Sequence, residues 1–170
     1  MMKRWTWPCT SLLWLFVVSG QLSAFAESSP ETELPPVGTV VPDVICGRVD
    51  ALALTYDLLV PVAKSNGATV IFVVSGGWNS VWFPPRMAMV PQWRGMSLLH
   101  DLLTDGYHIA IVRHGSAPRY KVPDAAEHVR KALWHIRETA PERGLDPERI
   151  GAFGFSAGGH LSLYLAMLGG

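Results

Sequence analysis

The sequence predicts an α/β fold in which a mostly parallel sheet carries helices on both faces. Apolar runs rich in β-branched residues, such as 69–74 and 107–115, are typical of strands buried on both faces. Helical patterns follow these runs, and a strand–helix–strand succession requires crossover connections that place the strands parallel. The expected helices cover 96–106, 123–144 and 157–168, and a further inner strand covers 150–155.

Two apolar stretches precede these units, at 44–49 and 51–61. In the second, Leu52, Leu54 and Tyr56 occupy alternate positions, as in an antiparallel strand with one buried face. We therefore expect an antiparallel strand pair at the N-terminal side of the sheet.

The clearest helical pattern begins near Asp124. Asp124 can act as the N-cap, with Glu127 three residues later completing a capping box. We expect this helix to pack on the sheet, with its histidines, His128 and His135, away from any site. One face of the helix carries the apolar residues Ala125, Val129, Ala132, Leu133 and Ile136.

The composition allows one domain with a hydrophobic core. The chain has 170 residues, of which 14 are basic and 14 acidic, and it contains no block of like charge. Nucleic-acid binding is therefore not expected. The histidines and carboxylates lack metal-ligand spacing, and the dinucleotide pattern G-x-G-x-x-G is absent, so no cofactor is predicted.

The first 26 residues have the pattern of a secretory signal peptide. Lys3 and Arg4 precede the apolar segment 11–18, and Ala24 and Ala26 form an A-x-A cleavage pattern. The apolar segment is shorter than the roughly 20 residues that span a bilayer. We therefore expect cleavage and a secreted or periplasmic protein without a membrane span; an uncleaved N-terminal anchor is the alternative.

Three parts of the chain follow from this prediction: a signal peptide at 1–26, an extended proline-rich leader at 27–43, and one domain at 44–170. Removing the signal peptide leaves a formal charge of −2 and Cys46 as the single cysteine, so an internal disulfide is excluded. Cys46 is expected to be a small buried hydrophobic residue, with a nucleophilic thiol as the minor alternative.

The segment from Gly154 to Gly158 has the spacing G-x-S-x-G between an expected strand and an expected helix. In that context the turn is too tight for flanking side chains, and it lifts the Ser156 hydroxyl clear of the sheet as a nucleophile. The N–H of Ala157 would then face a bound carbonyl oxygen. A glycine-rich turn with a solvated serine is the alternative.

A second glycine pair, Gly76 and Gly77, follows the expected strand at 69–74. Their N–H groups could complete an oxyanion hole at the same sheet edge, because the carboxyl ends of parallel strands meet there; a simple glycine turn is the alternative. The loop continues with Trp78 and Trp82, which either shape a substrate pocket or fill the space between loop and body.

The segments "VVSGGW", "LTYDLLVP" and "GLDPERIGAFGFSAGGHLS" resemble the α/β-hydrolase superfamily, in particular its esterase–lipase branch, including acetyl-xylan and feruloyl esterase-like and prolyl-oligopeptidase-like proteins. The resemblance runs from about Val44 to Leu168. It implies that Ser156 is the nucleophile and that Gly76, Gly77 and Ala157 form the oxyanion hole. Where many relatives have H-G-G, this chain has Ser75 before the two glycines.

The partners that would activate the serine are missing from the expected place. In this fold the acid and the histidine follow the nucleophile, but the 14 residues after Ser156 contain no Asp or Glu and only His160, on the adjacent helix. His114 with Asp124 is a weak substitute, since a loop position and a helix cap explain these residues better.

We therefore expect the N-terminal part of a secreted serine ester hydrolase, truncated after the elbow helix, with later strands missing and little activity alone. A small-molecule or polysaccharide ester is the expected substrate. The alternative is a noncatalytic secreted α/β module that binds a ligand or partner.

Overall fold

The computed structural model describes residues 36–91 and 97–167. They belong to the second of two compact units, Pro35–Gly170. The predicted signal peptide and the first part of the predicted leader lie outside the described residues.

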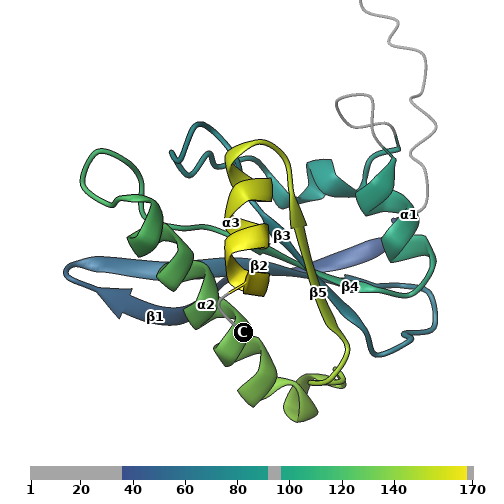
Figure 1. Cartoon of the computed structure of the whole chain (residues 1–170). Coiled ribbons are helices and arrows are strands. Elements are labelled where there is room, and N and C mark those ends of the chain that lie inside the picture. Colours follow the sequence, from purple (N-terminus) through teal and green to yellow (C-terminus); the bar gives the residue numbers. More distant parts are fainter. Residues whose placement is uncertain (1–35, 92–96, 168–170) are drawn as a thin grey trace, which may run out of the picture. The chain divides into compact units, whose positions relative to one another are not determined.

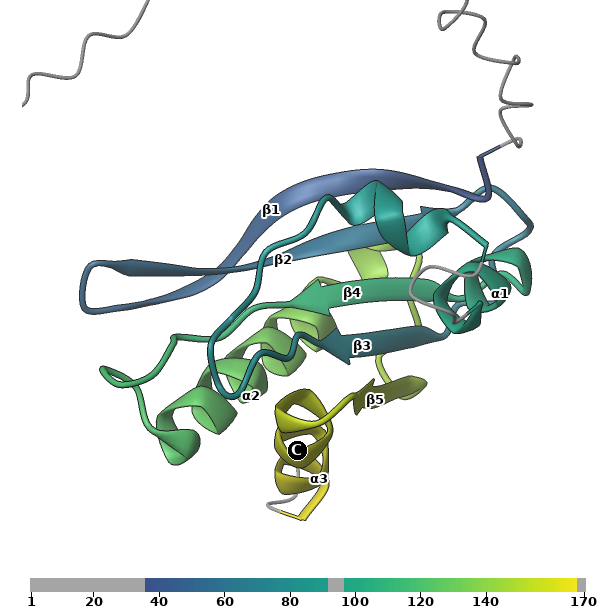
Figure 2. The same cartoon turned by 90° about the horizontal axis from the view of Figure 1, so that it is seen from above.

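One mixed sheet of five strands organises the described chain (Figures 1 and 2), in the order β1-β2-β4-β3-β5. β1 pairs antiparallel with β2, and β2 pairs antiparallel with β4. β3 pairs parallel with β4 on one side and with β5 on the other. The strands are β1 (Gly38–Val49), β2 (Leu52–Pro61), β3 (Thr69–Val73), β4 (His108–Val112) and β5 (Ile150–Gly154).

Helices cover both faces of this sheet, as the sequence predicted. On one face, α2 (Val122–Thr139) and α3 (Ala157–Met167) enclose a core with Tyr56, Ile71 and Val112. On the other face, α1 (Leu98–Thr104) and the 3₁₀ helix η1 (Pro85–Met89) cover a second core. A further 3₁₀ helix, η2 (Pro141–Arg143), follows α2.

The first strand begins earlier than the sequence predicted. Residues 38–43 were assigned to an extended leader, but they lie in β1, and residues 38–41 pair with the end of β2. The prediction was wrong there because backbone pairing with β2 outweighs the proline-rich composition. A register shift follows Val41, and the amide of Asp43 (φ 50°) donates to Asp57 Oδ1 at 2.9 Å.

The long helix also begins earlier than predicted. Its N-cap is Lys121, and Asp124 lies inside the first turn, where its carboxylate accepts the Lys121 amide at 2.8 Å. Glu127 binds Arg130 instead of completing a box with Asp124. The prediction that Asp124 is the N-cap was wrong because Pro123 is tolerated in the first helical turn, so the helix already begins at Val122.

A buried ion pair joins β2 to the end of β4. The Asp57 side chain is almost fully buried and receives the Arg113 guanidinium. Arg113 also donates to Thr55 Oγ1 at 3.4 Å. The pair thus ties the loop after β4 to β2, and through Asp57 to the irregularity in β1.

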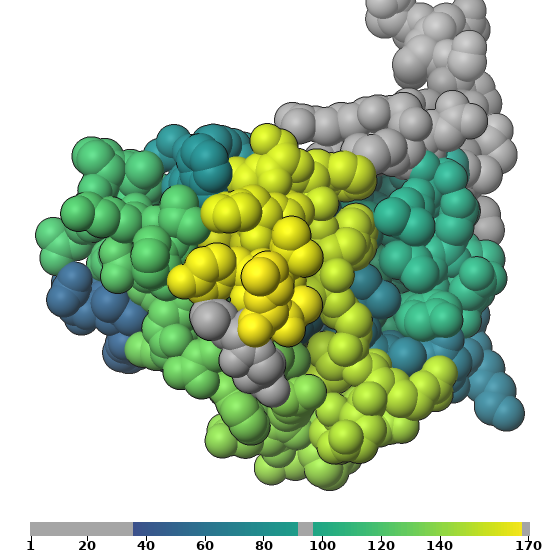
Figure 3. Space-filling view, in the orientation of Figure 1, coloured from purple at the N-terminus to yellow at the C-terminus, as the bar shows by residue number. Residues whose placement is uncertain are grey.

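β5 forms the edge of the described sheet, and no other described strand lies beyond it. Gly151 and Ala152 are exposed. The yellow C-terminal part of the chain, which includes α3, lies at the surface in Figure 3, and Leu163 and Met167 of α3 are exposed. Within the described ranges, no helix has the length and apolarity needed to cross a membrane.

Burial of histidines predicts acid sensitivity. Burial lowers the pKa of His108, His128 and His135 from the ordinary value of 6.5, so the unfolded chain binds more protons once the pH falls below that value. The stability from these neutral rings is present above pH 6.5 and lost as the pH falls toward the folded pKa values. We expect urea unfolding midpoints to fall from pH 7.5 to pH 5, and His108→Asn to reduce the fall. In the control His100→Gln, the urea midpoint should fall between pH 7.5 and pH 5 as much as in the wild type. An equally large fall in His108→Asn would show that the buried ring of His108 is not a cause of the acid sensitivity.

Candidate active site

Ser156 lies at a sharp strand-to-helix turn between β5 and α3 (Figure 1). Its φ of 48° is in the left-handed region, which a non-glycine residue rarely adopts. The residue is exposed, whereas Ala157 after it is buried. The turn therefore holds a strained backbone with the serine at the surface, as expected of a nucleophile elbow.

The two glycines of the motif are required by close packing. A Cβ on Gly158 would lie 2.3 Å from the carbonyl oxygen of Val73, and one on Gly154 would lie 2.6 Å from the carbonyl carbon of Gly158. The first turn of α3 therefore rests directly on the end of β3. The flanking glycines are explained by this contact as well as by the turn itself.

The loop after β3 makes a second tight turn. Gly76 (φ 156°) accepts the Asn79 amide at 3.1 Å, and a Cβ on it would lie 2.5 Å from Asn79 O. A Cβ on Gly77 would contact nothing within 4 Å, so space does not require a glycine here. Its φ of 61° does favour glycine over other residues. Trp78 follows, also with positive φ, at 62°.

Three backbone N–H groups at this sheet edge remain without partners. Within residues 36–91 and 97–167, the amides of Gly76, Gly77 and Ala157 donate to no protein acceptor. They come from the loop after β3 and the first turn of α3, which the contact of Gly158 with Val73 holds together. These are the amides that the sequence predicted for an oxyanion hole.

Hydrogen bonds also join the loops after β3 and β4. Ser80 donates its amide to Ser116 Oγ at 2.9 Å and accepts the His114 amide at 3.2 Å, while Ala117 N–H donates to Trp78 O at 3.1 Å. The carboxyl ends of β3, β4 and β5 thus meet at one edge, as predicted from the parallel strand order.

The described histidines near this edge have structural contacts. His114 is buried, its Nδ1 lies 2.8 Å from Gly115 O, and its Nε2 is a buried atom without a partner among the described residues. Asp124 makes no hydrogen bond to it and is committed to the Lys121 amide. His160 is exposed and contacts the rings of Trp78 and Tyr164, so it has the helix-surface position that the sequence predicted.

His128 departs from the sequence-based expectation. It was placed away from the site, but its Nδ1 accepts the Gly115 amide at 3.0 Å in the loop after β4. The second turn of α2 therefore packs against this loop. Neither this contact nor the Asp57–Arg113 pair carries a signal in the sequence, because the partners lie 13 and 56 residues apart.

The other candidate chemistries find no support in the described chain. Cys46 is half-buried, and burial raises the pKa of its thiol to about 11, so the reactive thiolate is scarce at neutral pH. No three His, Cys, Asp or Glu side chains of residues 36–91 and 97–167 group as metal ligands.

The aromatic loop is partly packed and partly open. Trp78 is 38% exposed and meets His160 edge-on at 6.0 Å between ring centroids. Trp82 is 63% exposed and therefore does not simply fill a gap. Trp93, a further tryptophan later in the same segment, lies outside the described residues.

A parallel strand, a strained serine turn and a helix packed by two glycines define the class of α/β-hydrolases. The chain belongs to the BD-FAE family, an α/β-hydrolase esterase family whose model matches residues 56–170.

Two named proteins are similar to part of this chain. The chain is 38% identical to arylacetamide deacetylase of Oryctolagus cuniculus over 76 residues, which are 42% of this chain and 19% of that protein. It is 23% identical to an arylesterase of Saccharolobus solfataricus over 123 residues, or 71% of this chain and 37% of that protein.

Solved esterase structures have the same fold. An arylesterase structure matches with a TM-score of 0.59 at 24% identity, covering 79% of this chain and 41% of that chain. Esterase 2 of Thermogutta terrifontis, phosphorylated by paraoxon, matches with a TM-score of 0.58 at 26% identity, covering 75% and 46%. The chain thus spans less than half the length of each of these proteins.

Proposed function

We propose that this chain supplies the nucleophile and oxyanion hole of a secreted serine ester hydrolase that forms an acyl-enzyme at Ser156. The observation that carries the proposal is the exposed serine at φ 48° at the sheet edge where three amides have no acceptor among the described residues. Amides fixed by glycine packing need no reorganisation when negative charge develops, and this makes them effective donors.

In the proposed reaction, Ser156 Oγ attacks the ester carbonyl carbon while a base takes its proton. Gly76, Gly77 and Ala157 donate to the oxyanion. The alcohol leaves with a proton, and water then releases the acid and restores the serine.

The base and its carboxylate partner are the open part of the proposal. His114 and His160 are held by other contacts, and the chain has no Asp or Glu after Ser156. We propose that these two groups come from sequence that follows Gly170 in the whole protein, and that the 170-residue chain alone reacts slowly.

The substrate class is proposed from the relatives and the loop. By their names, the arylacetamide deacetylase removes acetyl groups from arylacetamides and the arylesterase hydrolyses aryl esters. The exposed Trp82 offers an aromatic surface in the same loop as Gly76 and Gly77. The N-terminal signal pattern adds polysaccharide acyl esters as accessible substrates outside the cell.

Ser156→Ala tests the nucleophile. We expect a fluorescent fluorophosphonate to label the protein extended by its downstream reading frame, and labelling to fall to background in Ser156→Ala. Intact mass should show one phosphonyl adduct, located on the peptide that contains Ser156.

The matched control is Ser65→Ala, in the exposed turn before β3 at the opposite sheet edge, which should label normally. Labelling that survives in Ser156→Ala disproves the nucleophile. An extended wild-type protein that is folded but never labelled would favour a noncatalytic ligand-binding module instead.

A further inference from the structure

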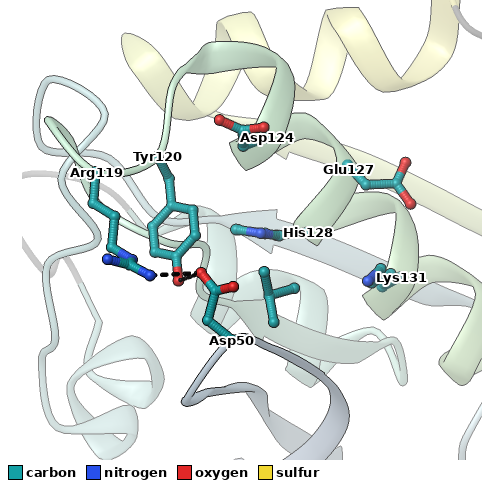
Figure 4. A pocket seen from close by; sticks show the side chains of 8 residues that line it. Asp50, Arg119, Tyr120, Asp124, Glu127, His128 and Lys131 are labelled. Carbon is teal, nitrogen blue, oxygen red and sulfur yellow. Dashed lines mark hydrogen bonds and ion pairs between the residues drawn. The ribbon is translucent and has the colours of Figure 1, made fainter.

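A hollow lies between the β1–β2 turn and the first half of α2 (Figure 4). It has a volume of about 460 Å³, within the range of small-ligand sites. Arg119 and Tyr120 lie on one side, Lys131 on the other, and His128 between them. Neither Ser156 nor the glycine pair at 76–77 lines it.

One wall is fixed by a small polar cluster. Asp50, at the β1–β2 turn, accepts Arg119 at 2.7 Å and the Tyr120 hydroxyl at 3.3 Å, both through Oδ2. The Arg119 guanidinium lowers the pKa of Asp50, so the carboxylate stays charged. Its Oδ1 accepts no bond from the described residues and remains an available acceptor.

The floor is a buried histidine with one free nitrogen. His128 is 2% exposed, and its Nδ1 accepts the Gly115 amide at 3.0 Å. Burial lowers the pKa of His128, and in the neutral ring that acceptor role places the proton on Nε2. Nε2 has no partner in the described part of the chain. The Tyr120 ring meets this histidine edge-on at 5.0 Å.

The opposite wall adds a free cation. Lys131 lies one turn after His128 on the same face of α2. Its stem passes over Gly47, and its ammonium forms no ion pair with any described residue. Two acids line the same hollow, Asp124 and Glu127, but Glu127 is neutralised by Arg130 at 2.7 Å.

The lining therefore combines available donors and acceptors with no dominant charge. His128 Nε2–H and the Lys131 ammonium donate, Asp50 Oδ1 accepts, and Tyr120 contributes an aromatic ring. The nearby carboxylates would repel a bound anion, and Lys131 and Arg119 would repel a bound cation. Hydroxyl groups both donate and accept, so a neutral polyol satisfies both kinds of group at once.

We propose that this hollow, which we call the β1–α2 pocket, is a noncatalytic binding site for a neutral sugar residue. The site does not depend on the reaction at Ser156, since it is built from Asp50, Tyr120, His128 and Lys131.

Binding is tested on the 170-residue chain with cellobiose and maltose as probes. We expect millimolar binding by saturation-transfer NMR and a shift of the His128 ring signals. Lys131→Met should weaken binding about tenfold, as loss of one charged hydrogen bond predicts. The control Lys64→Met, outside the pocket, should bind like wild type, and so should Ser156→Ala, which separates this site from the elbow.

Ionic strength and anions provide the opposing outcomes. The affinity for the disaccharides should be roughly constant between 20 and 500 mM NaCl, because salt screens interactions between charges and the ligand carries none. Acetate or inorganic phosphate that binds more tightly than the disaccharides and shifts the same ring would overturn the proposal in favour of an anion site. Disaccharide binding that Lys131→Met leaves unchanged would also overturn it.

Discussion

Gly158→Ala should lower the free energy of unfolding by about 3 kcal/mol, at the upper end of the usual cost of overpacking. The added Cβ would lie 2.3 Å from Val73 O and 3.2 Å from its carbonyl carbon, both in rigid backbone. The first turn of α3 would have to move off β3, and this would displace the Ala157 amide from the glycine loop. Urea unfolding followed by circular dichroism measures the stability, and fluorophosphonate labelling of the extended protein measures the site.

The matched control is Gly151→Ala in the adjacent strand. A Cβ on Gly151 meets nothing within 4 Å, and Gly151 is exposed on β5. Stability should stay within about 0.5 kcal/mol of wild type or rise, because alanine suits a strand better than glycine. Gly158→Ala that unfolds and labels like Gly151→Ala would show that the tight contact with Val73 is wrong.

The second large effect is expected for Asp57→Asn, with a loss of about 3 kcal/mol in the free energy of unfolding. The asparagine keeps an oxygen for the Asp43 amide but removes the charge that faces Arg113. Arg113 has a side-chain exposure of 14%, and in this variant its only remaining counter-charge among the described residues would be the exposed Asp43 carboxylate, 3.7 Å from Nη1. Its buried end would therefore be left largely desolvated beside a neutral amide. Urea unfolding at pH 7.5 measures the change.

Two further variants test whether the loss of stability comes from breaking a buried ion pair and not simply from removing a carboxylate. Arg113→Met in the Asp57→Asn background should recover part of the lost stability, since no uncompensated cation remains. Asp50→Asn removes an exposed carboxylate that also pairs with an arginine, and it should unfold close to wild type because that pair is solvated. If Asp57→Asn and Asp50→Asn lowered the free energy of unfolding equally, burial of the Asp57–Arg113 pair would not explain the effect.

Much of the candidate site could be predicted from the sequence because it depends on local backbone rules. The spacing of Gly154, Ser156 and Gly158 between an apolar strand and an apolar helix specifies a sharp turn. The parallel order of the strands then brings this turn to the same edge as Gly76 and Gly77. The roles of these residues in catalysis stay predictions that the labelling experiment tests.

The contacts that surround the site could not be predicted in the same way. His128 reaches the loop after β4 because α2 packs beside that loop, where Gly115 donates its amide to the ring. The β1–α2 pocket brings Asp50 to Arg119 across 69 residues of chain. Neither contact produces a periodic pattern or a short motif in the sequence, so local sequence patterns could not reveal it.

The sequence alone determined the α/β class, the two-sided helix cover and the glycine-flanked serine, because burial periodicity and turn chemistry act over a few neighbouring residues. Only the tertiary structure decided that β1 starts at Gly38, that Lys121 caps α2 and that Asp57 takes Arg113 as its partner. The start of β1 and the Asp57–Arg113 pair depend on free energy gained where segments distant in the chain meet across the sheet. The cap at Lys121 depends instead on a local contact with Asp124, which the sequence pattern had assigned to the cap position itself.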